Sequence, residues 1–201
     1  FDDPNNPWKD YSMYNHLFTA NNDVAWANKN VCKWYGCVDF TANSSTPNFD
    51  YLNSTAKWSD TSGMAIGFWI YLTEDASKIH EILRIGESPN EKDLDITSYG
   101  LRLEADTDNG RFSKADGTND APSVNTWHHY FVVYKPNEAF LIWRNGDLTE
   151  NTTHSSGNLN HSIGDLIKIG FNSNRDMQGY LDELVVWNRS NFTSSDVLGF
   201  Y

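Results

Sequence analysis

The pattern of apolar and polar positions along the chain predicts strands over most of its length. Short runs in which apolar and polar residues alternate, as in a half-buried strand, are separated by segments rich in Gly, Pro, Asn, Asp and Ser. The runs are residues 17–26, 37–40, 64–72, 79–85, 100–105, 111–114, 127–134, 139–144, 166–171 and 179–187. No run of helical period and helical length precedes the last few residues. We therefore predict an all-β chain that folds as a two-sheet antiparallel jelly-roll sandwich with a short C-terminal helical turn.

The segments between these runs have the composition of loops and turns. We expect loops at residues 43–47, 87–95, 107–110, 116–123 and 149–160. Asn145 and Gly146 favour a two-residue hairpin turn, because both residues tolerate positive φ. No internal repeat or low-complexity linker divides the sequence, so we expect a single domain over residues 1–201.

The segment 177–201 carries the most informative pattern of the chain. Strict alternation would place the even-numbered residues from Tyr180 to Val186 on one face of a strand and the odd-numbered residues on the other. Asp182 is then a carboxylate in a largely buried strand, where it needs a partner. Thr193 and Asp196 have the spacing of a capping box, which predicts the start of the terminal helix.

This closing segment resembles that of a known family. The sequence G-Y-L-D-E-L-V-V-W from Gly179, followed by Asn188-Arg189 and a capped helix, is similar to the end of laminin-G-like domains. These domains belong to the concanavalin A-like lectin/glucanase superfamily. Segments 10–16, 36–40, 66–70, 127–129 and 167–170 resemble the same family in order, so the resemblance spans nearly the whole chain. It implies a jelly-roll fold, but a fold shared by many functions does not decide which function this chain has.

The charge of the chain limits the partners that it can bind. Its 27 acidic and 15 basic residues give a formal net charge of -12, which argues against nucleic acid and anionic membranes because both require a basic face. The same charge favours cations. No apolar run approaches the length that spans a bilayer, so we expect no membrane insertion. Because the chain begins at Phe1 rather than Met, we expect that any signal peptide or flanking region was removed or is not included.

The resemblance also implies a calcium site between the two ends of the chain. In family members that bind calcium at this edge, oxygen ligands come from the first and last strands, which lie side by side. The matching residues here are Asp3, Asp10 and Asp182, with Asn15 or a backbone carbonyl near Tyr11 as a further ligand. Calcium prefers such oxygen ligands. The alternative is that Asp182 caps a turn by accepting backbone N–H bonds and that the N-terminal acids are solvated.

Two cysteines, Cys32 and Cys37, enclose the short sequence K-W-Y-G. They form either one disulfide or two thiols, and two cysteines are too few for a structural zinc site. A disulfide would close a short loop and stabilise the fold by about 2 kcal/mol. The closed loop would hold Trp34 and Tyr35 as a rigid platform on which a sugar ring stacks. Alternatively, these two rings seal one end of the sandwich.

The other aromatic residues and the glycosylation motifs have simpler interpretations. The tryptophans within strand runs are predicted to be core residues: Trp69, Trp127, Trp143 and Trp187. Sequons occur at Asn43, Asn53, Asn151, Asn160, Asn188 and Asn191. Together with a disulfide and the family resemblance, these sequons indicate a secreted or cell-surface glycoprotein.

Catalysis finds little support in the sequence. Glucanases of this superfamily carry glutamates that alternate on one strand, as in E-x-D-x-E, and this chain has no such run. Residues 91–95 alternate but lack the second glutamate, and Asp182 and Glu183 are adjacent and would face opposite ways. His128 and His129 match ordinary scaffold positions of the family. The remaining histidines lack metal-ligand spacing.

We therefore expect a non-catalytic extracellular recognition or adhesion module, a lectin-like domain that binds glycan or glycoprotein and is stabilised by calcium. The first alternative is a structural building block that self-associates in an extracellular surface or filament assembly. A glycoside hydrolase is the second alternative. A ligand cannot be read from the pattern, because loops rather than the strands carry binding in such sandwiches.

Overall fold

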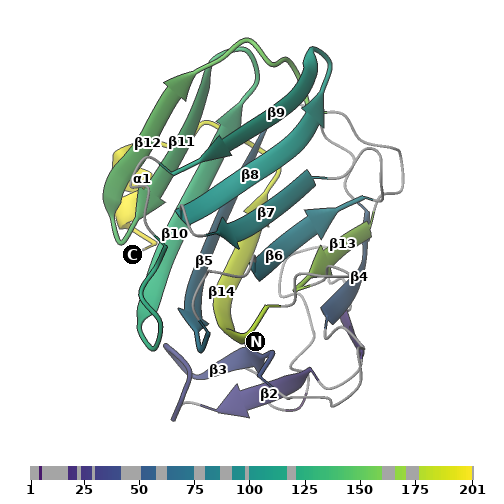
Figure 1. Ribbon diagram of the computed structural model, residues 1–201, viewed down its shortest axis with the longest axis vertical. Coiled ribbons are helices and arrows are strands. Elements are labelled where there is room, and N and C mark those ends of the chain that lie inside the picture. Colours follow the sequence, from purple (N-terminus) through teal and green to yellow (C-terminus); the bar gives the residue numbers. More distant parts are fainter. Residues whose placement is uncertain are drawn as a thin grey trace.

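Strands make up most of the chain in the computed structural model (Figure 1). The structure describes residues 5, 18–21, 24–28, 30–41, 51–57, 63–74, 80–86, 92–97, 100–116, 121–159, 166–170 and 177–200. The elements in these ranges are β1 (Phe18–Asn21), β2 (Ala25–Asn28), β3 (Gly36–Asp39), β4 (Tyr51–Lys57), β5 (Met64–Leu72), β6 (His80–Ile85), β7 (Lys92–Thr97), β8 (Gly100–Thr107), β9 (Gly110–Ala115), β10 (Trp127–Lys135), β11 (Ala139–Arg144), β12 (Asp147–Thr153), β13 (Leu166–Ile169), β14 (Gly179–Trp187) and α1 (Ser194–Leu198).

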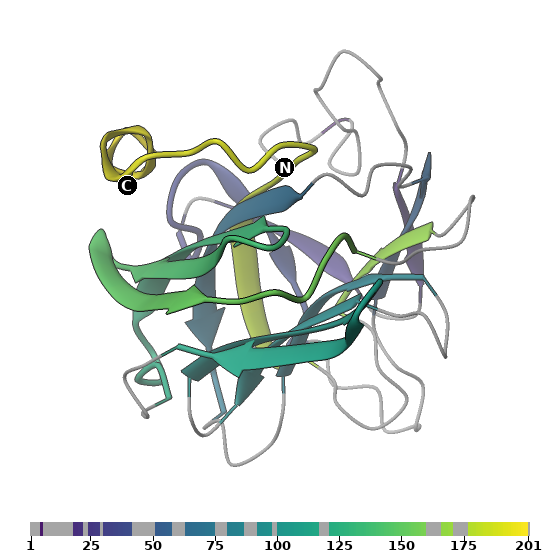
Figure 2. The same ribbon diagram turned by 90° about the horizontal axis from the view of Figure 1, so that it is seen from above.

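The strands form two seven-stranded sheets that lie face to face, as Figure 2 shows from above. The front sheet has the order β1-β4-β13-β6-β7-β8-β9, and the back sheet has the order β12-β11-β10-β5-β14-β3-β2. Neighbouring strands pair antiparallel, for example β5 with β10 and with β14. The predicted two-sheet antiparallel sandwich is thereby confirmed.

The main core lies between the two sheets and follows the two-residue period of the strands. On β5 the inward side chains are those of Met64, Ile66, Phe68, Ile70 and Leu72, each at most 1% exposed. The front sheet contributes residues such as Leu101, Leu103 and Ala105 of β8, which are equally buried. Burial of this apolar surface from both sheets is the main term that holds the sandwich together.

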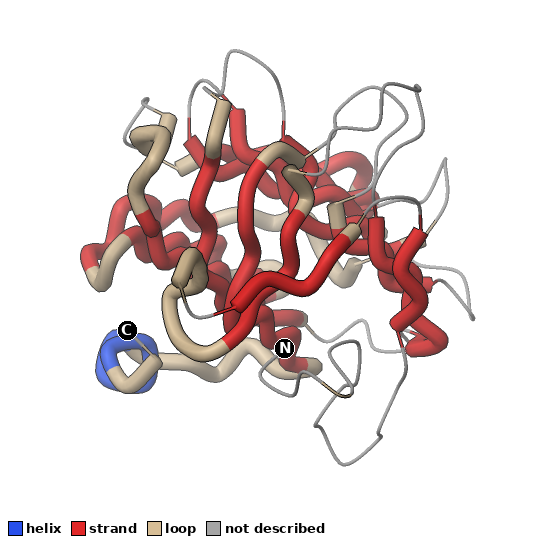
Figure 3. Tube along the Cα trace, turned by 90° about the horizontal axis from the view of Figure 1, so that it is seen from below, coloured by secondary structure: helices blue, strands red, loops and turns tan. Residues whose placement is uncertain are grey.

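A second cluster covers part of the outer face of the back sheet. Ala65, Phe131 and Trp143 lie on that face, and Phe192 and Val197 of the C-terminal segment pack over them. Figures 2 and 3 show this segment and α1 on the side of the back sheet that faces away from the front sheet. Because β5 and β10 are buried on both faces here, their sequences are nearly continuously apolar.

The C-terminal helix begins as the sequence predicts. Thr193 accepts a hydrogen bond from the backbone N–H of Asp196, and the Asp196 carboxylate accepts one from the backbone N–H of Thr193. This reciprocal pair is the predicted capping box. The hairpin turn at Asn145 and Gly146 is also confirmed, since both residues have positive φ, 53° and 89°, between β11 and β12.

The predicted strict alternation along β14 is wrong beyond Asp182. The register against β5 shifts between Asp182 and Val185, and Glu183 adopts a φ of 50°. This bulge turns the strand over, so Leu184 and Val186 join Leu181 at the main core while Trp187 joins the outer cluster. Tyr180 and Asp182 pair with Tyr71 and Trp69 on the outer face instead.

Several predicted strands and loops have different bounds in the structure. Residues 92–95 and 149–153 lie in β7 and β12 rather than in loops. The strand β4 has no counterpart among the predicted runs. The run 17–26 is divided into β1 of the front sheet and β2 of the back sheet. The missed strands are largely polar, and cross-strand pairing rather than an apolar pattern defines them.

Candidate functional site

A disulfide closes the loop between β2 and β3. Cys32 and Cys37 are bonded, with their Cα atoms 5.4 Å apart, which decides between the disulfide and the two thiols. The loop leaves Trp34 51% exposed and Tyr35 72% exposed. Both rings therefore stand in solvent, as a stacking platform requires.

Two contacts fasten this loop to the outer face of the back sheet. The backbone N–H of Trp34 donates a hydrogen bond of 3.1 Å to Oδ2 of Asp182. The Nζ of Lys33 lies 3.9 Å from the centroid of the Trp69 ring, a close cation–π contact. Asp182 is fully buried, and its Oδ1 accepts the backbone N–H of Glu183 at 2.9 Å. The carboxylate thus satisfies backbone donors at the bulge and in the loop, as the capping alternative expected.

Below the loop, three side chains form one row across the sheet. Trp69 on β5 faces His129 on β10 and Asp182 on β14. The rings of Trp69 and His129 have centroids 5.1 Å apart, and both side chains are almost fully buried. Burial lowers the pKa of His129 to about 4, with a further contribution from the positive charge of Lys33. His129 is therefore neutral at pH 7 and acts as scaffold.

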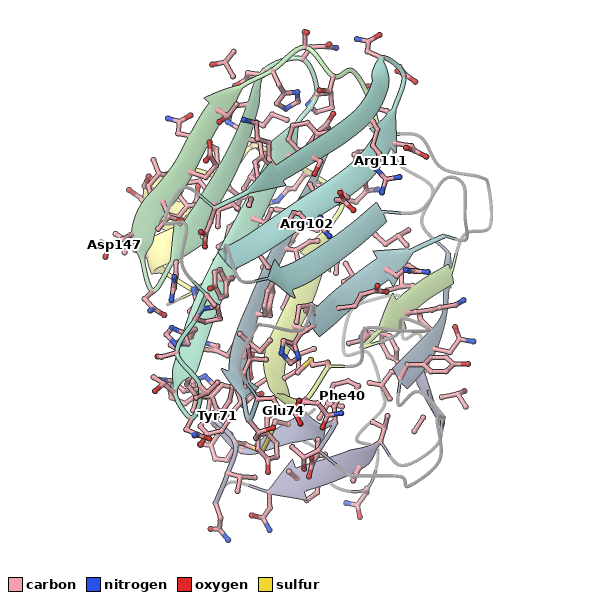
Figure 4. All side chains as sticks on the ribbon, in the orientation of Figure 1. Phe40, Tyr71, Glu74, Arg102, Arg111 and Asp147 are labelled. Atoms are coloured by element: carbon pink, nitrogen blue, oxygen red, sulfur yellow. A yellow bond between two sulfur atoms is a disulfide. The ribbon has the colours of Figure 1, made fainter. Side chains whose placement is uncertain are left out.

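The next row along the same face is aromatic throughout. Tyr71 pairs with Trp127 of β10 and with Tyr180 of β14, and the ring centroids are 5.6 and 5.7 Å apart. All three side chains are half-buried. The Tyr71 hydroxyl lies 3.5 Å from Oδ1 of Asn125, an exposed residue just before β10. Figure 4 shows Tyr71 at the end of the molecule where β5 ends, close to Glu74.

Sequence reasoning did not find this aromatic row. Trp127 is half-buried on the outer face rather than in the core, and so is Trp187, whereas Trp69 and Trp143 are buried as predicted. The sequence pattern predicts no binding role for Tyr71 or Tyr180. Each of the strands β5, β10 and β14 carries an aromatic residue at an outward position, which is a weak signal in the sequence. Only the register of the three strands brings Tyr71, Trp127 and Tyr180 together.

The proposed calcium ligands are only partly within the described residues. Asp3, Asp10 and Asn15 lie outside them, so their distance from Asp182 is not defined. Within the described ranges, no group of three or more His, Cys, Asp or Glu residues has the arrangement of a metal site. Asp182 supplies carboxylate oxygens, the type of ligand that calcium prefers, and these oxygens also accept hydrogen bonds from the backbone N–H groups of Trp34 and Glu183.

The sequons differ in their accessibility. Asn151, Asn188 and Asn191 are exposed. Asn53 is half-buried in β4, and its Oδ1 is enclosed without a hydrogen-bond partner in the described part of the chain. Asn43 and Asn160 lie outside the described residues.

Two glutamates of the front sheet are held by arginines. Glu81 is fully buried, and its Oε1 lies 2.9 Å from Nε of Arg84. Glu104 lies 3.3 Å from Arg102 and 3.2 Å from Arg111, the two arginines labelled in Figure 4.

The environment of Glu104 is that of a structural ion pair. Burial raises the pKa of Glu104, but Arg102, a hydrogen bond from Ser113 and Arg111 together outweigh burial and lower that pKa. A general acid needs the opposite shift.

No helix in the described part of the chain has the length and apolar composition to cross a membrane.

A laminin G family model, described as the concanavalin A-like lectin/glucanases superfamily, matches residues 45–197. This match covers well over half of the chain. The chain belongs to this superfamily. A search of curated proteins finds no match to this chain.

Solved structures share the fold at low sequence identity. The binding domain of botulinum neurotoxin serotype G superposes with a TM-score of 0.71 at 13% identity, over 96% of this chain and 47% of that one. The binding domain of Paraclostridial Mosquitocidal Protein 1 gives 0.71 and 13%, over 96% and 48%. This chain therefore spans about half the length of these two binding domains.

A third structure matches over nearly its whole length. Domain 4 of AbnA, a GH43 extracellular arabinanase from Geobacillus stearothermophilus solved in complex with arabinotriose, has a TM-score of 0.72 at 15% identity, over 97% of this chain and 93% of that one. At these identities the likeness establishes the fold alone.

Proposed function

We propose that this chain is a non-catalytic extracellular module of one domain that recognises glycan or glycoprotein. The observation that carries the proposal is the disulfide loop, which presents Trp34 and Tyr35 to solvent. Asp182 holds the backbone of this loop, and Trp69 contacts its Lys33 side chain. A loop that is already closed and fastened loses little conformational entropy on binding. The C–H groups of a sugar meet a flat aromatic face well, and aromatic residues with few polar neighbours are typical of ligand sites.

Three further observations support the proposal. The arabinanase domain of the same fold was solved with a bound oligosaccharide, and the toxin structures are binding domains. The carboxylates of Glu81 and Glu104 are engaged with arginines, so these two acids are poor candidates for acid–base catalysis. The exposed Asn151, Asn188 and Asn191 are suited to an extracellular, glycosylated chain.

The test is binding of the purified domain to a glycan array. We expect Trp34→Ala and Tyr35→Ala each to weaken binding about tenfold or more, as truncation of an aromatic anchor does. Tyr51→Ala is the matched control, because Tyr51 is a half-buried tyrosine of the front sheet. Array binding that is equal in wild type and in both loop variants would contradict the site.

The alternative function is a building block that associates with itself. The observation in its favour is the exposure of apolar residues near α1, since Leu198 is 59% and Phe200 44% exposed. If the domain binds no glycan on the array and forms defined oligomers in sedimentation experiments, this alternative is favoured.

We also propose a stabilising calcium ion at Asp182, with Asp3, Asp10 and Asn15 as the other side-chain ligands. A ligand that binds only the folded state at about 100 times its Kd adds about 2.7 kcal/mol of stability. Chelation should therefore lower the melting temperature of wild type, and added calcium should restore it. Asp182→Asn should remove most of this dependence on calcium. An unchanged melting curve of wild type in chelator would show that the site is wrong.

A further inference from the structure

The aromatic row of Tyr71, Trp127 and Tyr180 has no role in holding the two sheets together. These side chains point away from the main core, since the neighbouring positions Ile70, Leu72 and Leu181 are the inward ones. The C-terminal segment covers the outer face around Ala65 and Phe131. The row lies toward the other end of β5, where its three rings remain half-buried.

The row is adjacent to the disulfide loop. The loop is bonded to Asp182 and rests on Trp69, and these residues are two positions from Tyr180 and Tyr71 on the same strands. Residues two apart on a strand share a face and lie about 7 Å apart. The loop with Trp34 and Tyr35 and the row therefore occupy neighbouring positions on one continuous face.

The geometry of the rings selects the shape of a ligand. The ring plane of Tyr71 is inclined by 56° to that of Trp127 and by 64° to that of Tyr180. Three rings inclined in this way cannot form one flat platform, so they do not suit the planar surface of a crystalline polysaccharide. They offer separate faces and edges to successive sugars of a single, soluble chain.

The carboxylates near the row select against acidic ligands, and Lys33, a cation on the same face, lies over the ring of Trp69. Asp39 is the cross-strand neighbour of Tyr180, and Glu74 follows the end of β5. Carboxylates accept hydrogen bonds from sugar hydroxyls but repel sulfate and carboxylate groups. The net charge of -12 adds to this repulsion.

We propose that Tyr71, Trp127 and Tyr180 form a second sugar-stacking surface next to the disulfide loop, so that this face binds a neutral, single-chain oligosaccharide long enough to contact both. This inference rests on the proposed function, because it extends the Trp34 and Tyr35 site. It predicts that affinity rises with the number of sugars, since a longer ligand reaches the second surface without the entropic cost of a separate binding event.

The experiment is calorimetric titration with cello-, xylo- and arabino-oligosaccharides of one to six sugars. Microcrystalline cellulose and heparin serve as the flat and the acidic counterparts. We expect at least one neutral series to bind more tightly with length, and we expect both counterparts to bind weakly. Tyr71→Leu and Tyr180→Leu keep an apolar side chain in the strand but remove the flat ring. Each should weaken binding of the longest oligosaccharide about tenfold and leave that of the shortest ligand unchanged.

The outcomes separate the two proposals. Trp34→Ala should weaken binding at every length, and Tyr51→Ala should change nothing, with folding of each variant checked by thermal unfolding. If affinity increases with length equally in wild type, Tyr71→Leu and Tyr180→Leu, the second surface is refuted while the loop site stands. If wild type binds none of the three series, or binds heparin or cellulose better, the inference is refuted, and the glycan array then decides the loop site.

Discussion

Single side chains decide how the disulfide loop is held. The ammonium group of Lys33 lies over the ring of Trp69, and the neutral ring of His129 lies beside the same indole. A cation contact of this kind contributes about 0.5–2 kcal/mol, more when it is shielded from water. An imidazolium at His129 would bring a second positive charge to the buried site. The arrangement therefore depends on the neutral form of His129.

The first prediction concerns the pH dependence of stability. The pKa of His129 is about 4 in the folded protein and 6.5 ordinarily, so between these values the unfolded chain binds the proton that the folded protein does not. The free energy of unfolding should fall as pH falls from 6.5 to 4, by about 3 kcal/mol at most. His129→Gln should reduce this loss, measured by urea denaturation at pH 7, 5.5 and 4.5.

Other titrating groups set the limits of this experiment. The pKa values of Glu104 and Asp196 are lowered, so their contributions are lost only as pH falls below the ordinary range of carboxylates. Burial is also the main cause that lowers the pKa of His154, so His154 and His129 change the free energy of unfolding in the same direction as pH falls. His154→Asn therefore measures the part of the loss that comes from His154. Parallel pH profiles of wild type and His129→Gln would contradict the assignment to His129.

The elements of the fold show which features local sequence reveals. Runs rich in apolar residues identified the strands that are buried on one or both faces, among them β5, β10 and β14, and the Thr193 cap identified α1. The bulge in β14 was hidden because residues 184–187 are all apolar, so either face satisfies the pattern. The polar strands β4 and β12 lack an alternating pattern and form through pairing.

The candidate site shows the same division. Cysteine spacing alone pointed to the loop that exposes Trp34 and Tyr35, because a short closed loop is a local feature. The aromatic row depends on the register of three strands, which pairs Tyr71 with residues more than 50 positions away. No local pattern carries this information, so the row could not be predicted from sequence.

The second prediction concerns the disulfide loop as an element. Replacement of both Cys32 and Cys37 by Ser should lower the free energy of unfolding by about 2 kcal/mol, the entropy of closing so short a loop. The freed loop should also bind glycan more weakly, since Trp34 would have to be ordered on binding. Denaturant unfolding with and without dithiothreitol measures the first effect. Reductant should affect wild type and not the double variant; equal stability of all samples would contradict the prediction.

In the whole molecule, one part of the outer face of the back sheet contributes to stability, and another part carries the proposed binding surface. Along β5, Ala65 lies under the C-terminal segment, Trp69 lies under the disulfide loop, and Tyr71 belongs to the half-buried aromatic row. One end of the face is therefore sealed by the chain itself, and the other end presents the proposed binding surface. This organisation predicts that the two properties can be changed separately.

The last prediction tests this separation with substitutions in the C-terminal segment. Phe192 of this segment is 4% exposed, and its ring centroid lies 5.2 Å from the ring centroids of both Phe131 and Trp187. Phe192→Ala should lower the free energy of unfolding by about 3–5 kcal/mol, because it leaves a cavity in the outer cluster. Thr193→Ala should cost only about 1 kcal/mol through the lost cap. Leu198→Ala, at an exposed position of the same segment, should change stability by less than about 0.5 kcal/mol.

At a temperature where all three variants remain folded, their affinity for a glycan bound by wild type should equal that of wild type. The physical reason is that Phe192 contacts Phe131 in the middle of β10 and Trp187, which pairs with Ala65 near the start of β5, whereas Tyr71 and Trp127 lie at the opposite end of this strand pair. Urea denaturation and calorimetric titration of the same preparations measure the two properties. A Phe192→Ala variant that is folded but has lost glycan binding would show that the sealed end shapes the recognition surface.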